Sequence, residues 1–166
     1  YDDLDLFLFS PQSSSEINLS WAESLKRTEI IFPESYLSKK FSSLWRSLFL
    51  SNVLEKNELD IYHGLSHELP PGIKNKVKAS VVTIHDLIFL RFPQFFPWID
   101  RQVYLKKYQA SCRRADLILA ICENTKSDLI NLLGVPSEKI RVAYQSCHTL
   151  FEKIYSQVDL YKGLDR

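Results

Sequence analysis

The central strand of this protein is predicted by the stretch ASVVTIHD, residues 79–86. Apart from Ser80, its first six residues, 79–84, are apolar or β-branched, and they fall on both faces, which is typical of a strand that is buried on both sides of a parallel sheet. A histidine and an aspartate, His85 and Asp86, follow at its end. A second run of the same kind, LILAIC, occupies residues 117–122. The two runs indicate neighbouring strands in the middle of a parallel sheet.

Strand-like and helix-like segments alternate along the rest of the chain. Short apolar runs predict further strands at residues 4–9, 29–32, 59–62 and 140–144. Apolar residues at helical spacing predict helices at residues 36–56, 97–115 and 125–133. Thr125 and Asp128 are spaced as a capping box for the last helix, and Gly134 suits its C-terminal end. The alternation predicts an α/β fold with a mainly parallel sheet flanked by helices.

Composition narrows the functional class. The 166 residues suit one domain, and 21 basic against 20 acidic residues argue against a nucleic-acid-binding protein. No apolar run approaches the ~20 residues of a membrane span. Three cysteines, Cys112, Cys122 and Cys147, form no CxxC pair, so we expect unpaired thiols in a reducing, cytoplasmic compartment. From the lack of methionine and the start at Tyr1 we expect either a processed chain or an excised piece of a longer protein.

His85 and Asp86 are the first candidate functional residues. Ligands of parallel sheets bind beyond the carboxyl ends of the strands, which is where this pair is expected. A His-Asp pair also marks metal-dependent phosphohydrolases, but those carry it on a helix, whereas residues 81–84 read as a strand. The simpler alternative is an interior histidine followed by an aspartate that caps the next turn. Position at the strand end favours a functional role.

A second polar strand end follows residues 59–62. His63, Gly64, Ser66 and His67 are predicted to form a loop that lines a binding cleft. The H-x-x-x-H spacing of the two histidines binds zinc on a helix, but the glycine and the prolines that follow disfavour a helix here. No third ligand is apparent nearby, so we predict no metal site.

A third strand end runs into the start of a helix. Glu123, Asn124 and Thr125 open that helix, whose free N–H groups favour anions such as phosphate. The four glycines of the chain fit no GxGxxG, Walker or GxSxG motif, which excludes a free-standing dinucleotide-binding or P-loop domain.

Two basic pairs lie seven residues apart on the helix predicted at 97–115. They are Lys106, Lys107, Arg113 and Arg114, and they are expected on one face, opposite the apolar one. Such a face is either simply solvated or attracted to anionic lipid headgroups.

Three motifs in this order carry a family resemblance. They are VVTIHDL at residues 81–87, RADLILAICENTK at residues 114–126, and GVPSEKIRV at residues 134–142. Together they resemble the N-terminal, acceptor-side domain of a retaining GT-B glycosyltransferase of the group-one type (family four), the one that includes many mannosyltransferases.

The resemblance implies a Rossmann-like domain over residues 1–150, with residues 151–166 starting a linker toward a donor-binding domain. The usual first strand and its Gly-rich loop, and the whole donor domain, would lie outside this chain. By the same resemblance, His85 reaches the donor sugar and Asp86 orients the loop or the acceptor. The acceptor side would be lined by His63, Gly64, Ser66, His67, Glu123, Asn124 and Thr125. The family usually has serine where this chain has Cys122.

The resulting expectation is a fragment of a glycosyltransferase of cell-surface polysaccharide or lipopolysaccharide synthesis. Its substrates would be a nucleotide sugar and a saccharide or glycolipid acceptor, with no cofactor and no metal. Its other partners would be its own donor domain and, peripherally, the inner face of the membrane. The alternative is a stand-alone, non-catalytic α/β module that binds a sugar or phosphate.

Overall fold

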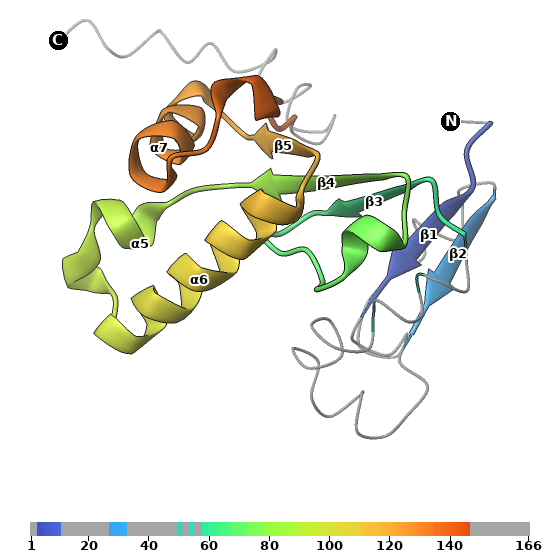
Figure 1. Ribbon diagram of the computed structural model, residues 1–166, viewed down its shortest axis with the longest axis horizontal. Helices are drawn as coiled ribbons and strands as arrows, with labels where there is room; N and C mark the ends of the chain where they lie inside the picture. Colours follow the sequence, from blue (N-terminus) through green and yellow to red (C-terminus); the bar gives the residue numbers. More distant parts are fainter. Residues whose placement is uncertain (1–2, 11–26, 33–49, 51–53, 55–57, 147–166) are drawn as a thin grey trace, which may run out of the picture.

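The computed structural model describes residues 3–10, 27–32, 50, 54 and 58–146, and two parallel sheets lie within them (Figure 1). In the smaller sheet, β1 (Leu6–Phe9) pairs with β2 (Thr28–Ile31). In the larger sheet the order is β3 (Ile61–Gly64), β4 (Ala79–Ile84), β5 (Leu117–Ala120), β6 (Ile140–Val142). The two sheets touch where the ring of Phe9 lies 6.3 Å, centroid to centroid, from that of Tyr62.

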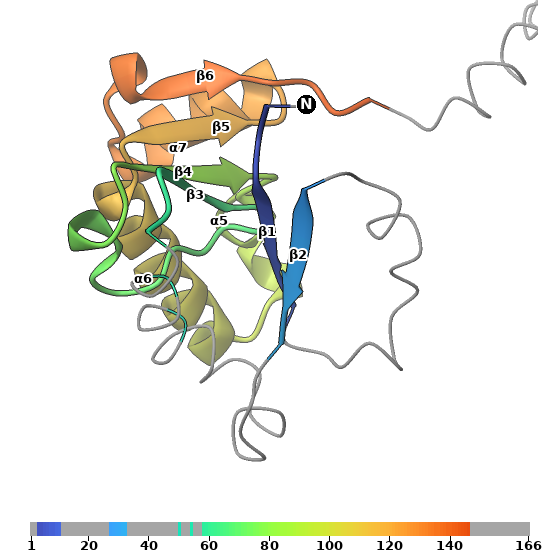
Figure 2. The same ribbon diagram turned by 90° about the vertical axis from the view of Figure 1, so that its right-hand side faces the viewer.

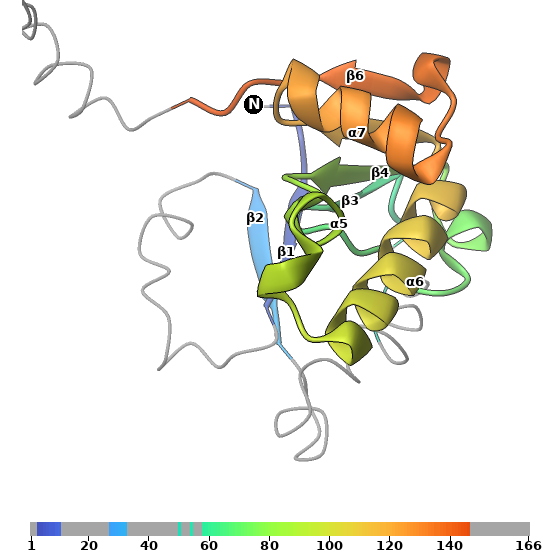
Figure 3. The ribbon, with the colours of Figure 1, turned by 90° about the vertical axis from the view of Figure 1, so that its left-hand side faces the viewer.

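Helices connect the strands of the larger sheet. The α-helices are α5 (Ile88–Arg91), α6 (Trp98–Arg114) and α7 (Glu123–Leu133). Single 3-10 turns are η2 (Ile73–Asn75), η3 (Pro93–Phe95) and η4 (Ser137–Lys139). Both long helices, α6 and α7, lie on one face of the sheet, which Figures 2 and 3 show from opposite sides. This is the predicted α/β, Rossmann-like architecture.

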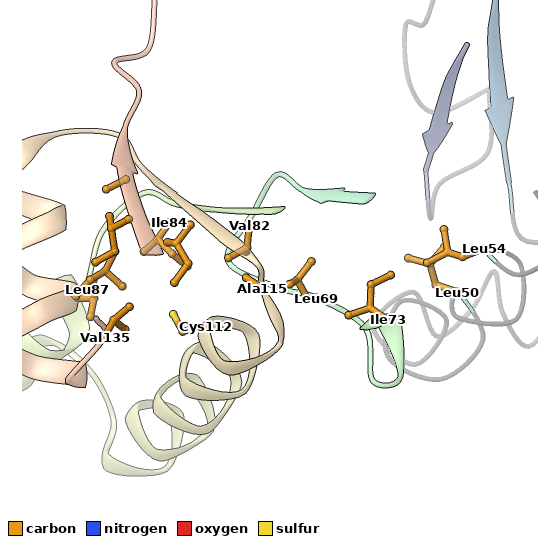
Figure 4. Close-up of a cluster of buried hydrophobic side chains, with 14 residues drawn as sticks. Leu50, Leu54, Leu69, Ile73, Val82, Ile84, Leu87, Cys112, Ala115 and Val135 are labelled. Atoms are coloured by element: carbon orange, nitrogen blue, oxygen red, sulfur yellow. The ribbon is translucent and has the colours of Figure 1, made fainter. Parts of the chain in front are cut away.

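The predicted central strand is confirmed to the residue, because β4 spans 79–84 and lies between β3 and β5. Its alternate residues Ser80, Val82 and Ile84 are fully buried. Val82 and Ile84 meet apolar side chains from α6, β5, α7 and β6 in one cluster (Figure 4). A strand that fills the core in this way fixes the position of whatever follows its carboxyl end.

Several predicted boundaries were wrong. The strands predicted at 4–9, 117–122 and 140–144 are shorter, at 6–9, 117–120 and 140–142. Two further differences lie at the site. The strand predicted at 59–62 is observed two residues later, so His63 and Gly64 belong to β3 rather than to a loop. Their backbones pair in register with Val81 and Val82, and a ladder made by backbone groups tolerates a polar side chain. The helix predicted from Thr125 begins at Glu123, because the side chain of Cys122 caps it.

The helix predicted at residues 36–56 lies almost wholly outside the described residues. Of that segment only Leu50 and Leu54 are described; both are helical and buried in the core cluster (Figure 4).

Candidate functional site

Parallel pairing brings the carboxyl ends of β3, β4, β5 and β6 to one edge of the larger sheet. The segments that leave this edge start at Leu65, His85, Ile121 and Ala143. Ligands of open parallel sheets bind at this edge. The predicted site residues at the ends of β3, β4 and β5 therefore lie along this one edge.

His85 is held by protein groups on several sides. Its Nε2 lies 2.9 Å from the carbonyl oxygen of Leu65, and because a carbonyl only accepts, Nε2 carries the proton and donates. The other ring nitrogen, Nδ1, lies 3.4 Å from the side-chain amide nitrogen of Gln145, which donates to it. The His85 carbonyl accepts a 2.9 Å hydrogen bond from the hydroxyl of Thr125. The contacts therefore define one tautomer, with Nδ1 as the acceptor.

His67 contacts both the backbone and the ring of His85. Its Nδ1 accepts a hydrogen bond from the backbone N–H of His85 at 3.3 Å, and the two rings meet edge to face with centroids 5.0 Å apart. On its other side the ring stacks on Tyr108 of α6, with centroids 4.7 Å apart. Its backbone has φ 59°, a left-handed conformation that is uncommon for residues other than glycine, and its N–H donates to the carbonyl of Thr83 at 3.0 Å. His67 is thus part of the scaffold of the site.

The pKa values of both His67 and His63 are lowered by the protein. Burial lowers the pKa of His67, and the nearby His85 lowers it further, while Asp86 acts weakly in the opposite direction. Burial also lowers the pKa of His63, whose Nε2 lies 2.8 Å from the hydroxyl of Thr83 on the neighbouring strand. A neutral imidazole is needed for the acceptor role that Nδ1 of His67 plays toward His85.

Gly64 ends β3 where the chain folds back on itself. A Cβ at this position would lie 2.2 Å from the carbonyl oxygen of Glu68, far inside contact distance. Only glycine therefore allows the turn at residues 65–68 to approach β3 closely. That turn brings the Leu65 carbonyl and the His67 ring to His85.

Asp86 and Ser66 are exposed beside this cluster. Oδ1 of Asp86 accepts a 3.0 Å hydrogen bond from the backbone N–H of Ile88, which shapes the turn into α5. The aspartate of the predicted pair therefore does what the simpler alternative expected of it, and its carboxylate is also open to solvent.

At the third strand end, the sulfur atom of Cys122 caps the start of α7. Sγ of Cys122 accepts from the backbone N–H of Thr125 at 3.5 Å and lies 3.3 Å from its hydroxyl. These contacts lower the pKa of the Cys122 thiol. Glu123 and Asn124 are exposed, whereas Thr125 is buried and bonded to His85. Thr125 thus joins α7 to the histidine cluster.

The sequence-based prediction missed one ion pair next to the site. Arg91, at the end of α5, forms a bidentate ion pair with the buried Asp128 of α7 at 2.6–2.9 Å, and it also donates a hydrogen bond to Asn124 at 3.3 Å. The predicted capping box had assigned Asp128 to a different role. Gln145 was also missed, because nothing in a polar residue after the last strand marks it as a partner of His85.

The four basic residues of α6 do not form one free face. Lys107 pairs with Glu68 at 3.4 Å, and Arg114 donates to the Leu69 carbonyl at 3.0 Å. Arg113 lines a different hollow, next to Lys139. The predicted basic face is therefore divided between two hollows, and Lys106, Lys107 and Arg114 share one of them.

Within the described residues, no group of three or more histidine, cysteine or acidic side chains could hold a metal ion. Cys112 and Cys122 are both free thiols, and burial raises the pKa of Cys112 to about 11. No helix in the described part of the chain is long and apolar enough to cross a membrane.

Comparison with known proteins gives two matches. A family model described as Glycosyltransferase Family 4 matches residues 3–151. The chain is also similar to the O-antigen chain mannosyltransferase B of Escherichia coli, with 31% identity over 88 residues. That match covers 52% of this chain and 22% of the mannosyltransferase, so it spans about a fifth of the relative's length. No solved structure gives a significant match.

Proposed function

Because the chain belongs to glycosyltransferase family 4, we propose that it forms the acceptor-side domain of a retaining, GT-B-type enzyme. The enzyme moves a sugar from a nucleotide-sugar donor to a saccharide or glycolipid acceptor. The name of the Escherichia coli relative supports mannosyl transfer in the synthesis of a cell-surface polysaccharide such as lipopolysaccharide. The nucleotide sugar is a substrate, and the reaction needs no cofactor or metal from this chain. The enzyme works in the cytoplasm.

The observation that carries this proposal is the arrangement of His85 at the carboxyl end of β4. Its backbone and ring are fixed by Leu65, His67 and Thr125, which come from two other segments of the same sheet edge. Because of this pre-organisation, the His85 ring itself needs no rearrangement when substrate binds. The described bonds hold Nδ1 as an acceptor toward Gln145, an exposed side chain that a substrate hydroxyl can replace.

This geometry suggests a specific catalytic role. With Nε2–H occupied by the Leu65 carbonyl, His85 accepts a hydrogen bond from a donor-sugar hydroxyl at Nδ1. The alternative role of the same lone pair is to steady positive charge that develops at the anomeric carbon. Asp86 orients the turn that holds this ring, through its bond to the N–H of Ile88.

The acceptor side is assigned to the polar groups around His85. Ser66, Glu123 and Asn124 are exposed and available to saccharide hydroxyls, and His63 borders them on β3. Gly64, His67 and Thr125 act there by shape and by positioning, since their described contacts are with the protein itself.

The test is turnover by the native-length enzyme, assayed with a panel of nucleotide sugars. We expect His85→Ala to lower kcat by about 100-fold or more, as removal of a pre-organised polar group usually does. His85→Asn should retain more activity, because its side-chain oxygen replaces Nδ1 as an acceptor. The matched control is Lys78→Ala, beside the amino end of β4, where only an exposed ion pair with Asp60 is lost.

Near-normal turnover of His85→Ala, with an unchanged melting temperature, would rule out the proposed role of this residue. Tight binding of nucleotide sugars by residues 1–166 alone, with no turnover in the native-length protein, would instead favour a non-catalytic sugar- or phosphate-binding module.

A further inference from the structure

Just beyond the site, the chain exposes large apolar side chains over a short stretch. They form what we call the aromatic ridge: Ile88, Phe92, Phe95, Trp98, Ile99 and Val103. Phe95, Trp98 and Ile99 are the most exposed, at 73%, 66% and 67%. Isolated exposed apolar residues are ordinary, but a continuous group of them marks an interaction surface.

The ridge is one surface rather than a scatter of residues. It runs over α5, η3 and the first turns of α6, which lie together at one end of the molecule (Figures 1 and 3). The rings of Phe92 and Phe95 lie 6.4 Å apart. Phe89, in the same segment, turns inward and is 2% exposed, packed against Tyr104 and Tyr108. The segment is therefore folded against the domain through Phe89 and presents its remaining apolar side chains outward.

Basic residues continue the ridge along α6. Ile99 and Val103 are spaced by one helical turn, and Lys106 and Lys107 follow on the same outer side one turn later. Both lysines and Arg114, together with the Glu68 that pairs with Lys107, line a hollow of about 220 Å³ between α6 and the segment after β3. Residues 88–107 hold four basic side chains. Two of them are paired with acidic side chains of other segments, Arg91 with Asp128 and Lys107 with Glu68. Arg101 and Lys106 remain, against the single acidic Asp100 of the segment.

We propose that the aromatic ridge and this basic hollow together dock on an anionic lipid bilayer. Trp and Phe side chains favour the boundary between headgroups and acyl chains, and lysines beside them attract anionic headgroups. The inference rests on the proposed function in one respect, since a glycolipid acceptor would lie in the same surface. His85 and Asp86 directly precede α5, so docking on this surface brings the strand ends near the headgroups.

Charge and composition favour a bilayer over a protein partner. The hollow holds three basic side chains against the one acidic Glu68, and this excess is complementary to the negative surface of a membrane. An aromatic group that inserts into lipid needs no matching pocket. The sequence suggested membrane contact through a basic face alone. The ridge adds apolar side chains that can insert into the bilayer, which surface lysines cannot do.

The test is flotation of the native-length protein with vesicles. We expect it to bind vesicles of phosphatidylcholine with phosphatidylglycerol, and to bind phosphatidylcholine alone weakly. The double variant Phe95→Ser/Trp98→Ser should lose about tenfold or more in partitioning, because each ring contributes apolar area to insertion. The matched control Ile61→Ser/Leu132→Ser removes two exposed apolar side chains elsewhere and should bind like the wild type.

A charge variant tests the basic part separately. Lys106→Glu should weaken binding to the anionic vesicles about fivefold or more, since one basic side chain near such a surface contributes about 1 kcal/mol. Lys78→Glu, at the other end of the sheet, should not. Absence of wild-type binding, or equal binding by the ridge variant and its control, would overturn the proposal.

Transferase activity keeps the two proposals apart. With a water-soluble acceptor, the ridge variant should turn over like the wild type. Ridge-dependent vesicle binding without any transferase activity would remove the proposed function and leave the docking surface standing. Normal transferase activity together with vesicle binding that does not depend on the ridge would overturn the docking surface and leave the proposed function standing.

Discussion

The histidine cluster and the aromatic ridge are neighbours in sequence with opposite construction. At the cluster, polar groups are turned toward the protein: His85 and His67 make their described contacts with protein groups. At the ridge, apolar groups are turned toward the surroundings, and Phe95 is 73% exposed. The cluster is therefore pre-organised by internal hydrogen bonds, whereas the apolar side chains of the ridge are exposed. Changes in the cluster should therefore affect stability and geometry, and changes in the ridge should affect association alone.

Gly64→Ala should produce the largest loss of stability in the cluster. The new Cβ would lie 2.2 Å from the backbone oxygen of Glu68, and backbone cannot rotate away as a side chain can. We expect the free energy of unfolding to fall by about 3 kcal/mol, at the upper end of what overpacking costs. Chemical denaturation measures this directly.

The control for this prediction is Gly72→Ala. Gly72 has φ 76°, and no atom lies within 4 Å of the position that a Cβ would take there, so only the left-handed backbone is penalised. That penalty is about 1 kcal/mol. Equal losses for the two variants would show that close approach at Gly64 is not what shapes the turn.

Asp128→Asn should have the next largest effect, because it weakens the connection between the two regions. Arg91 joins α5, where the ridge begins, to α7, where Asn124 borders the site. The side chain of Asp128 is 7% exposed and that of Arg91 44% exposed, so the arginine left behind is partly hydrated. We therefore expect a loss of about 2 kcal/mol, below the usual cost of stranding a fully buried charge.

The exposed pair of Lys78 and Asp60 provides the comparison for that measurement. Asp60→Asn should change the free energy of unfolding by less than about 0.5 kcal/mol, since exposed ion pairs contribute little. If Asp128→Asn costs no more than Asp60→Asn, the ion pair does not fix α5 to α7.

The sequence predicted the sheet better than the site, for a physical reason. Apolar periodicity reports burial, so it located β4 and α6 closely. It does not report backbone pairing, which carries β3 past His63 to Gly64. The strand ends were predicted to converge, and they do. Their bonding was not predicted, because the contacts of His85 with Leu65 and Gln145 join residues that are 20 and 60 positions apart.

The ridge was also missed from sequence, although its residues were in view. Apolar residues in a helical segment are normally assigned to the core, and in α6 Tyr108 and Cys112 do face it. Ile99 and Val103 occupy the opposite side of the same helix, and Trp98 is exposed as its first residue. Only the positions of the neighbouring elements distinguish the covered side from the uncovered one.

The smallest predicted effect is a dependence of stability on pH at His67. Burial and the nearby His85 lower its pKa in the folded state, so the unfolded chain binds more protons just below the ordinary pKa of histidine. Its stabilising contribution is therefore complete above about pH 6.5 and is lost as the pH falls toward the lowered value. Protonation also removes the lone pair on Nδ1 that accepts from the N–H of His85.

Unfolding free energies at pH 7 and pH 5 test this for the wild type and for His67→Asn. Asparagine tolerates the left-handed backbone of this position and does not titrate. We expect the wild type to lose more stability than the variant between the two pH values, with the remaining dependence of the variant arising in part from His63, whose pKa is lowered by burial in the same direction. Identical pH dependence in both proteins would mean that His67 is not held neutral against His85. The cluster would then lose the internal bonding that sets it apart from the ridge.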